Sequence, residues 1–369
     1  MKKITIGFLG NIHFDTRTYN LFTSLKQTGQ EVSFVGYDWL TEKFKTSNED
    51  SIKVTKLNKR ISFFFYLYFF FSQLIDFIKI KTDIYFSSDF YSLPASVIAA
   101  KLKHATVYYD SREIYTELPA LENRPVLKKI FVEIEKFFIK RVDAVFTTGE
   151  MDSEYLNRIY NLEKAYLLRN LPLTHENIVP VDYHKMCNIP VDARIILYQG
   201  IIVHGRGIET YFRAVSKNEK IFLVLLGGGE HIDQYKSLSR KLNINERVIF
   251  AGKIPQSELL NYTAGAFAGL SLIDNISINN KYALPNKLFE YVMAGIPVIT
   301  SDLPQMKKIV NDYSIGEVIE ESSEDGLLEV INKWDKDKEF YSLLKENCRS
   351  AAKTLNWETE FSKVKEIFN

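Results

Sequence analysis

Short apolar runs alternate with amphipathic stretches along almost the whole chain. The runs have the length of buried strands, and the stretches between them place apolar residues at helical spacing. Such an alternation is typical of parallel sheets that are covered by helices. In the first half of the chain, strands are predicted at 3–10, 31–37, 83–89, 105–111, 143–149 and 164–170, and helices at 18–29, 61–80, 93–104, 126–141 and 153–160.

The alternation is interrupted once and then starts again. Residues 171–193 hold three of the ten prolines and show no steady apolar period, which is typical of a linker between domains. Beyond this segment, strands are predicted at 194–200, 220–229, 247–253, 267–273, 297–302 and 316–320, and helices at 207–217, 231–243, 257–264, 285–295 and 303–310.

These patterns predict an α/β protein with two Rossmann-like, doubly wound domains that face each other across a cleft. The predicted domains are 1–170 and 194–345, with 171–193 as the linker between them. Residues 346–369 are expected to form a helical segment that returns to the first domain. Ligands of such sheets bind at the carboxyl ends of the strands, so the loops that follow the strands should hold the functional residues.

Length, charge and cysteine content restrict the possible functions. A chain of 369 residues can build two domains, and its formal net charge of +1 indicates no nucleic-acid partner. Cys187 and Cys348 lie far apart without CxxC spacing, which indicates a reducing compartment and argues against a zinc knuckle. The apolar residues of 3–10 predict a strand rather than a signal peptide, because polar residues follow before any cleavage site. We therefore expect a cytoplasmic protein.

The segment 61–80 contains the densest aromatic run of the chain. Its uncharged part, 61–75, is shorter than the roughly 20 residues that a helix needs to cross a bilayer, so no spanning helix is predicted. One interpretation is that its broad apolar arc covers a sheet, and the other is that the arc partly enters a membrane interface between basic neighbours. On a helical projection the polar stripe is Ser62, Tyr66, Gln73 and Asp76, and the apolar arc is Phe63, Phe64, Leu67, Phe70, Phe71, Leu74, Ile75 and Ile78.

Three loops of the second half carry candidate binding chemistry. Glycines at 227–229 follow a strand and precede a helix, where backbone N–H groups can approach an anion, although such turns also use glycine for tightness alone. Arg206 stands between two glycines and could bind a diphosphate in a bidentate manner, or it could be a solvated surface residue. Lys287 and Glu290 are i, i+3 neighbours on one helix and suit a phosphate and a ribose diol, with a surface ion pair as the alternative.

Four segments in order, "VYYDSREIYTELP", "LYQGIIVHGRGI", "VIFAGKIP" and "LPNKLFEYVMAGIPVITSDLP", resemble the retaining glycosyltransferases of family 4. Their order and spacing match that family over nearly the whole chain. The resemblance implies the GT-B fold and transfer of a sugar from a UDP- or GDP-linked donor to a glycan or lipid-linked sugar acceptor. It also implies a role in the synthesis of cell-surface polysaccharide or glycoconjugate, with no cofactor and no metal.

In the second domain, the resemblance implies specific roles for the candidate residues. Glu290 matches the second glutamate of the family's paired-glutamate pattern and would hold the ribose, whereas Tyr282 stands where the first glutamate is expected. Arg206 takes the place of the basic residue on the diphosphate, and Lys287 is the second cation because Ile201 replaces a companion arginine. The other implied donor-side residues are Gly228, Gly229, Glu230, Gly252, Lys253 and Ile254 for the nucleotide, and Leu284, Pro285 and Asn286 beside the sugar.

In the first domain, "GNIHFDTRTYN" resembles the loop that closes over the donor. Asp15 and Arg17 are its polar pair, with a local salt bridge as the alternative interpretation. Arg112 replaces the family's histidine, and it is either a cleft residue or a structural partner of Glu113. This domain usually receives the acceptor, so the helix at 61–80 is expected to make peripheral contact with the inner face of the plasma membrane.

Arg206 and Lys287 are the predicted catalytic residues, because their charges would stabilise the departing diphosphate. Two alternatives remain open. Tyr282, Ile201 and Arg112 depart from the family pattern, which would suit a catalytically degenerate subunit that only binds a nucleotide-sugar. A GT-B nucleotide-sugar epimerase would need no acceptor at all.

Overall fold

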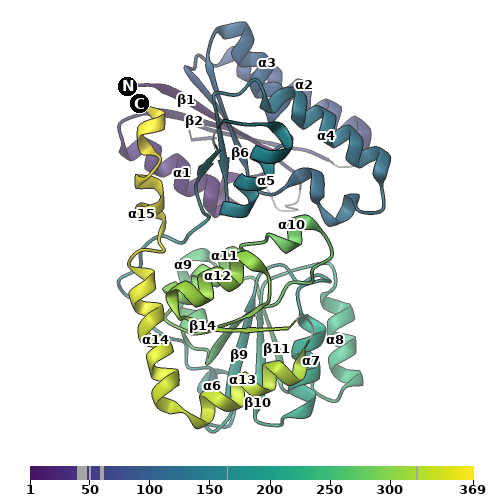
Figure 1. Ribbon diagram of the computed structural model, residues 1–369, viewed down its shortest axis with the longest axis vertical. Coiled ribbons are helices and arrows are strands. Elements are labelled where there is room, and N and C mark those ends of the chain that lie inside the picture. The colour runs from purple at the N-terminus through teal and green to yellow at the C-terminus, as the bar shows by residue number, and fades with distance from the viewer. Residues whose placement is uncertain (40–47, 50, 59–61, 164, 321–322) are drawn as a thin grey trace. The chain divides into compact units, whose positions relative to one another are not determined.

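The computed structural model describes residues 1–39, 48–49, 51–58, 62–163, 165–320 and 323–369 (Figure 1). The chain divides into two compact units. Unit 1 comprises Met1–Asn170 and Glu360–Asn369, and unit 2 comprises Leu171–Thr359. Each unit is described below by itself.

Unit 1 is built on one eight-stranded sheet in the order β3-β4-β2-β1-β5-β6-β7-β8. All neighbouring strands are parallel except β3, which is antiparallel to β4. The direction of winding reverses between β1 and β5, where Ile4 lies opposite Ile84. The strands are β1 Lys3–Phe8, β2 Glu31–Asp38, β3 Asn48–Glu49, β4 Ile52–Lys56, β5 Ile84–Ser87, β6 Thr106–Ser111, β7 Ala144–Thr147 and β8 Ala165–Leu167.

Helices cover both faces of this sheet. Figure 1 shows α2, α3 and α4 together on one side of the sheet and α1 on the other. The helices are α1 Thr16–Gln27, α2 Ser62–Lys79, α3 Leu93–Lys103, α4 Pro125–Ile139 and α5 Glu150–Tyr160, and the 3-10 turns are η1 Ile12–Phe14, η2 Tyr115–Glu117, η3 Pro119–Leu121 and η4 Lys365–Phe368.

The face of helix α2 that packs on the sheet differs from the apolar face that its hydrophobic pattern predicts. Phe65, Phe69 and Phe77 are buried. Two residues of the predicted polar stripe also lie on this inner side, where Gln73 is buried and Asp76 is half-buried, whereas Tyr66 is 36% exposed. Gln73 Nε2 donates to Ser92 Oγ at 3.2 Å and Asp76 accepts from Tyr37 Oη at 2.7 Å, whereas Gln73 Oε1 is buried without a hydrogen-bond partner among the described residues. Helix α2 thus lies on the sheet, as one interpretation expects, but it does so through residues such as Phe69 and Phe77 rather than through the predicted arc. Most of the arc that the structure describes is exposed; these residues are Phe64, Leu67, Phe71, Ile75 and Ile78. In the described part of the chain, no helix is both long and apolar enough to cross a membrane.

Unit 2 is built on a six-stranded parallel sheet in the order β11-β10-β9-β12-β13-β14. Winding reverses between β9 and β12, so the loops after these two strands lie at the position where such sheets bind ligands. The strands are β9 Arg194–Gln199, β10 Ile221–Leu226, β11 Val248–Gly252, β12 Ala268–Ser271, β13 Val298–Ser301 and β14 Gly316–Ile319.

Successive residues of the unit 2 strands enter two separate cores. Ile195 and Leu197 of β9 join the core under α11 and α12, while Ile196 and Tyr198 join the core under α7 and α13. Side chains of a strand alternate between faces, so both faces of this sheet are buried. The helices are α6 Tyr183–Met186, α7 Ile208–Lys217, α8 Ile232–Lys241, α9 Gln256–Ala264, α10 Ile278–Lys281, α11 Asn286–Met293, α12 Pro304–Tyr313, α13 Glu324–Lys336 and α14 Lys338–Ala352.

The segments at the predicted domain limits belong to these units. Residues 171–193 contribute Leu171, Tyr183 and Ile189 to a core of unit 2. Helix α15, Trp357–Ser362, carries the chain into unit 1, where Phe368 packs against Phe146 with ring centroids 5.7 Å apart. Two Rossmann-like, doubly wound α/β domains with C-terminal helices are thus present, and the predicted fold class is confirmed.

Candidate functional site

Two glycine-rich loops meet at the carboxyl ends of β9 and β10 in unit 2. Ile202 N donates to the Gly228 carbonyl oxygen at 2.9 Å. A Cβ atom on Gly227 would lie 1.9 Å from the Gly200 carbonyl oxygen, and one on Gly229 would lie 2.1 Å from that of Ile202. Side chains are excluded at both positions, so backbone amides are the groups that this part of the site can offer to a ligand.

Lys287 lies in the first turn of α11 and is 9% exposed. Its Nζ lies 3.8 Å from the centroid of the Tyr198 ring and 3.5 Å from the position of a Cβ atom on Gly200. Burial lowers the pKa of Lys287 well below its usual value, and the nearby positive charge of Arg206 lowers it further. A buried amine beside a second cation is stabilised by an anionic ligand, which would favour its charged form.

Arg206 is half-buried between Gly205 and Gly207, both of which have positive φ angles. Gly207 is the N-cap of α7 at φ 71°, so the loop delivers Arg206 at the start of a helix. The predicted catalytic residues Arg206 and Lys287 both follow strands at the carboxyl end of the sheet, and the charge of Arg206 contributes to lowering the pKa of Lys287.

Glu290 lies one turn after Lys287, and its carboxylate is held by a buried amide. Gln199 Nε2, at the end of β9, donates to Glu290 Oε2. Burial raises the pKa of Glu290, whereas the bond from Gln199, the charge of Lys287 and a bond from Gln256 act in the opposite direction. Glu290 is thus held by α9 and β9 rather than exposed as a surface ion pair.

The other predicted donor-side residues surround this centre. Tyr282 is the C-cap of α10 and accepts a hydrogen bond from Gln305 through its backbone oxygen. The loop that leads into α11 is half-buried up to Pro285, its N-cap, and Asn286 at the first helical position is exposed. Leu284 in that loop is half-buried, and at the ends of the neighbouring strands Gly228, Gly229, Gly252 and Ile254 are half-buried while Glu230 and Lys253 are exposed.

In unit 1, the predicted polar residues form one ion-pair network at the carboxyl end of the sheet. Arg17 binds Asp110 through Nε–Oδ2 and Nη2–Oδ1 contacts of 2.7 and 2.6 Å, so the local Asp15–Arg17 salt bridge is not the pairing found. Arg112 binds Asp15 in a bidentate manner at 2.8 and 2.9 Å and lies 4.7 Å from the Phe8 ring centroid. Burial would raise the pKa of Asp15, but the charge and hydrogen bonds of Arg112 outweigh burial and lower it.

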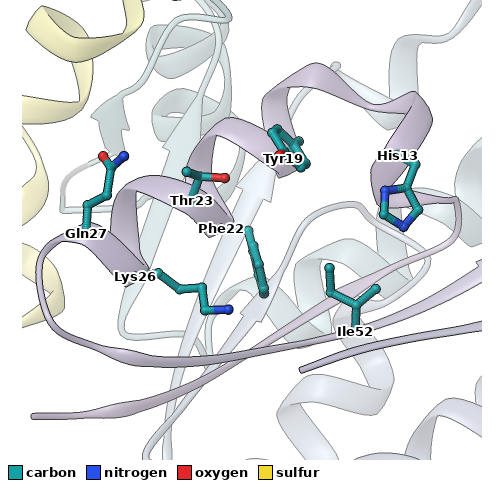
Figure 2. Close-up of a pocket in the computed structure, with 7 residues that line it drawn as sticks. All are labelled: His13, Tyr19, Phe22, Thr23, Lys26, Gln27 and Ile52. Atoms are coloured by element: carbon teal, nitrogen blue, oxygen red, sulfur yellow. The ribbon is translucent and has the colours of Figure 1, made fainter. Parts of the chain in front are cut away.

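A hollow of about 500 Å³ opens beside α1 in unit 1. Figure 2 shows Phe22 and Lys26 pointing from α1 toward Ile52 of β4. Lys26 is already held there by a 3.2 Å bond from its Nζ to Ser51 Oγ. None of the residues predicted to bind the donor lines this hollow; its lining is His13, Tyr19, Phe22, Thr23, Lys26, Gln27 and Ile52.

Three residues of the site were not identified from the sequence. The sequence predicts Tyr198 and Gln199 only as the end of a strand, and it predicts Thr263, whose hydroxyl donates to Gln199 Oε1 at 2.7 Å, only as part of a helix. A glutamine at the end of an apolar strand is a weak signal of a polar partner, and nothing local marks Thr263. Among the residues that the structure describes, no three histidine, cysteine or acidic side chains gather as metal ligands.

Residues 182–352 match the family model described as glycosyl transferases group 1. A lipopolysaccharide core biosynthesis glycosyltransferase of Rhizobium meliloti, LpsE, is 25% identical over 170 residues, 46% of this chain and 47% of that protein. An O-antigen biosynthesis glycosyltransferase of Escherichia coli, WbnH, is 23% identical over 60% of this chain and 59% of that protein. The matches thus cover about half of the length of these curated relatives.

Solved structures resemble the chain over its full length. A sucrose-phosphate synthase from Thermosynechococcus elongatus has a TM-score of 0.81 at 17% identity, covering 100% of this chain and 98% of that one. Anabaena Alr3699/HepE in complex with UDP-glucose has a TM-score of 0.76 at 14% identity, covering 100% and 99%. At these identities the likeness establishes the fold.

Proposed function

We propose that this chain, which matches the glycosyl transferases group 1 over residues 182–352, transfers a sugar from a nucleoside-diphosphate sugar with retention of anomeric configuration. The observation that carries this proposal is the buried Lys287 beside Arg206, at the reversal point of the unit 2 sheet. A cation pair at the carboxyl ends of parallel strands suits a diphosphate.

In the proposed reaction the bond between the anomeric carbon and the diphosphate oxygen breaks, and its electron pair leaves with the nucleoside diphosphate. Arg206, Lys287 and backbone N–H groups at the start of α11 would stabilise the developing negative charge, each contributing a few kcal/mol when well placed. The acceptor hydroxyl attacks from the same face, and a departing phosphate oxygen takes its proton. Glu290 would hold the ribose diol, and no protein side chain is required as the base.

The donor is proposed to be UDP- or GDP-linked, and UDP-glucose is the first probe because the similar Anabaena protein was crystallised with it. The acceptor is proposed to be a glycan or a lipid-linked sugar of a cell-surface polysaccharide or glycoconjugate. The names of the Rhizobium and Escherichia relatives, which refer to lipopolysaccharide core and O-antigen synthesis, support this class.

Donor turnover tests this proposal. The wild-type protein should release UDP or GDP from its sugar donor in the presence of an acceptor panel, and Arg206→Ala should lose at least tenfold in kcat/KM, because one charged contact to the diphosphate is removed. An Arg206→Ala enzyme with wild-type turnover would contradict the diphosphate role. Nucleotide binding without any turnover would favour a degenerate binding subunit, and conversion of the donor without an acceptor would favour an epimerase.

We also propose that the outer face of α2 contacts an anionic membrane. This face repeats apolar residues at helical spacing, and Phe64, Tyr68 and Phe71 are 64%, 61% and 56% exposed. The Tyr66 ring stacks on Tyr91 with centroids 5.2 Å apart, so the face begins beside the loop that follows β5. A lipid-linked acceptor at the membrane would then lie near the carboxyl end of the unit 1 sheet.

Charge on the neighbouring helices favours an anionic surface. In the described part of α2, α3 and α4, Glu133 is an exposed acid, whereas Glu135 is buried and Asp76 is paired with Lys53 at 2.6 Å. Basic residues near a bilayer surface contribute about 1 kcal/mol each. The exposed basic residues on these helices and next to their ends are Lys79, Lys81, Lys101, Arg124, Lys129, Lys136, Lys140 and Arg141.

Vesicle flotation tests the membrane contact. The wild-type protein should float with phosphatidylglycerol-containing vesicles at low salt, and a triple variant with Phe64→Ser, Tyr68→Ser and Phe71→Ser should not. Leu343→Ser on α14 is the matched control, since this exposed leucine lies in unit 2. Failure of the wild-type protein to float would contradict the contact, and would support the interpretation that α2 serves only to cover the sheet.

A further inference from the structure

We propose that Gln199 and Thr263 are positioning residues that keep the Glu290 carboxylate ionised and oriented for the nucleotide. This inference rests on the proposed role of Glu290 in holding the ribose. Gln199 and Thr263 are buried, and we propose no contact between them and the ligand. Their effect on nucleotide binding would therefore act through Glu290.

The three side chains form one hydrogen-bonded row from α9 through β9 to α11. Gln199 is 2% exposed, and its Nε2 donates to Glu290 Oε2. The Thr263 hydroxyl, which is fully buried, donates to Gln199 Oε1 at 2.7 Å. The backbone N–H of Gln199 donates to the Tyr291 hydroxyl at 3.1 Å, which fixes the end of the strand beside α11.

The direction in which the hydrogen bonds of this row are donated depends on the protonation state of Glu290. An ionised carboxylate only accepts hydrogen bonds, so it requires the N–H side of the Gln199 amide. The side-chain oxygen of Gln199 then faces Thr263 and accepts a hydrogen bond from the Thr263 hydroxyl, which has only one proton to donate. That hydroxyl also lies 2.7 Å from the Leu259 carbonyl oxygen, which is the acceptor available to it if the amide turns over.

A protonated Glu290 would reverse every bond in the row. The carboxyl group would donate to the Gln199 side-chain oxygen, and the Gln199 side-chain nitrogen would donate to the Thr263 hydroxyl oxygen. The Thr263 hydroxyl would then donate its hydrogen bond to the Leu259 carbonyl oxygen. The Thr263 hydroxyl therefore supports the ionised state when it donates to Gln199. An ionised carboxylate is also the better acceptor for two ribose hydroxyls, since charge-assisted hydrogen bonds are the stronger ones.

Burial makes this support necessary. Desolvation raises the pKa of Glu290, and the hydrogen bond from Gln199 is the first of the groups that lower it again. Lys287 on the same helix and Gln256 at the start of α9 also face Glu290 and act in the same direction. If Thr263 does not donate a hydrogen bond to Gln199 Oε1, the side-chain amide of Gln199 is free to exchange the positions of its oxygen and nitrogen. The hydrogen bond from Gln199 Nε2 to the Glu290 carboxylate is then weakened.

Calorimetric titration with UDP between about pH 5 and pH 8 tests the inference, with GDP in its place if the wild type binds only GDP. Binding should weaken on the acid side as Glu290 becomes protonated. Thr263→Val keeps the shape of the side chain and removes the hydroxyl proton. In this variant the loss of affinity on the acid side should begin at higher pH, and affinity in that pH range should fall roughly threefold to tenfold. Thr263→Ser keeps the hydroxyl and should restore the wild-type profile.

The outcomes separate the inference from the proposed function. An unchanged acid limb in Thr263→Val would overturn the positioning role, and so would an equal loss of affinity at every pH, which a merely structural defect would produce. Glu290→Gln tests the ribose role itself. If that variant binds UDP or GDP as tightly as the wild type, the assignment of Glu290 to the nucleotide is wrong, whatever Thr263→Val shows.

Discussion

At the scale of single residues, the buried pair of Arg17 and Asp110 should be essential for the stability of unit 1. The two side chains are 2% and 1% exposed, and Arg17 Nη1 also donates to the Leu168 carbonyl oxygen at 2.6 Å. Arg17→Met leaves a buried carboxylate without its bidentate partner and with only the longer 3.4 Å contact from Arg112 Nε, so we expect a loss of about 3 kcal/mol. Native-state hydrogen exchange of the β1 and β6 amides measures this loss.

The exposed pair of Lys3 and Glu31 provides the control for that measurement. Its side chains are 36% and 54% exposed, so Lys3→Met should cost less than about 1 kcal/mol. A loss of similar size in both variants would show that burial of the Arg17–Asp110 pair adds nothing.

Lys287 should take up a proton when the nucleotide binds. Its pKa is lowered by burial and by Arg206, so the free protein binds fewer protons than an ordinary lysine would at alkaline pH. A diphosphate beside Nζ raises that pKa, and binding should therefore take up as much as about one proton and become tighter as pH falls through this window. Calorimetry at about pH 8.5 in buffers of different ionisation enthalpy measures the uptake, which should vanish in Lys287→Met.

The sequence predicts individual functional residues, but it does not predict which distant side chains contact them in the folded protein. Lys287 and Glu290 could be placed on one helix face because i, i+3 spacing is local. Their partners Tyr198 and Gln199 lie on β9, about ninety residues earlier, and only the folded sheet brings them together. The same reason explains Arg17, for which a local pair with Asp15 is one interpretation of the sequence and whose partner in the structure is Asp110 on β6.

At the scale of elements, periodicity predicts most helices and strands but not the orientation of α2. A projection by hydrophobicity assumes that polar side chains face water. Gln73 and Asp76 face neighbouring elements instead, where Gln73 Nε2 donates to Ser92 and Asp76 accepts from Tyr37. The strand β4, Ile52–Lys56, is not predicted by the apolar pattern because it is short and three of its five residues are polar.

Two adjacent glycines should differ sharply in their tolerance of a side chain. Gly229→Ala would place a Cβ atom 2.1 Å from the backbone oxygen of Ile202, so the two loops must separate at a cost of about 1–3 kcal/mol and with loss of nucleotide binding. Gly228→Ala would meet only the flexible Lys253 side chain, at 2.8 Å, and should change stability by less than about 0.5 kcal/mol. Thermal unfolding of unit 2 measures both, and equal losses would argue against the close contact of the loops.

At the scale of the whole molecule, parallel topology explains why the candidate site could be anticipated at all. Every strand of the unit 2 sheet ends at the same edge, so loops that are distant in sequence meet there, and the reversal between β9 and β12 places Arg206 and Lys287 together. The same alternation of elements predicted two domains. It could not predict that residues 171–193 would supply Leu171 and Tyr183 to the core of unit 2, because that segment lacks a regular period.

Two units with separate cores should respond to separate perturbations. Phe368 is 1% exposed and packs in unit 1 against Phe146 and Tyr108, so Phe368→Ala should cost that unit about 3–5 kcal/mol. UDP at about one hundred times its Kd should stabilise unit 2 by about 2.7 kcal/mol. The two effects should add, because the perturbed sites share no partners.

Hydrogen exchange of both units in one sample distinguishes this behaviour from a single cooperative unit. Phe368→Ala should reduce protection in β5, β6 and β7 and leave β9 and β12 unchanged, while nucleotide should do the reverse. Loss of protection in β9 after Phe368→Ala would mean that the last ten residues, 360–369, stabilise both units at once. The independence of the two cores would then be wrong, even though each sheet has its own helices.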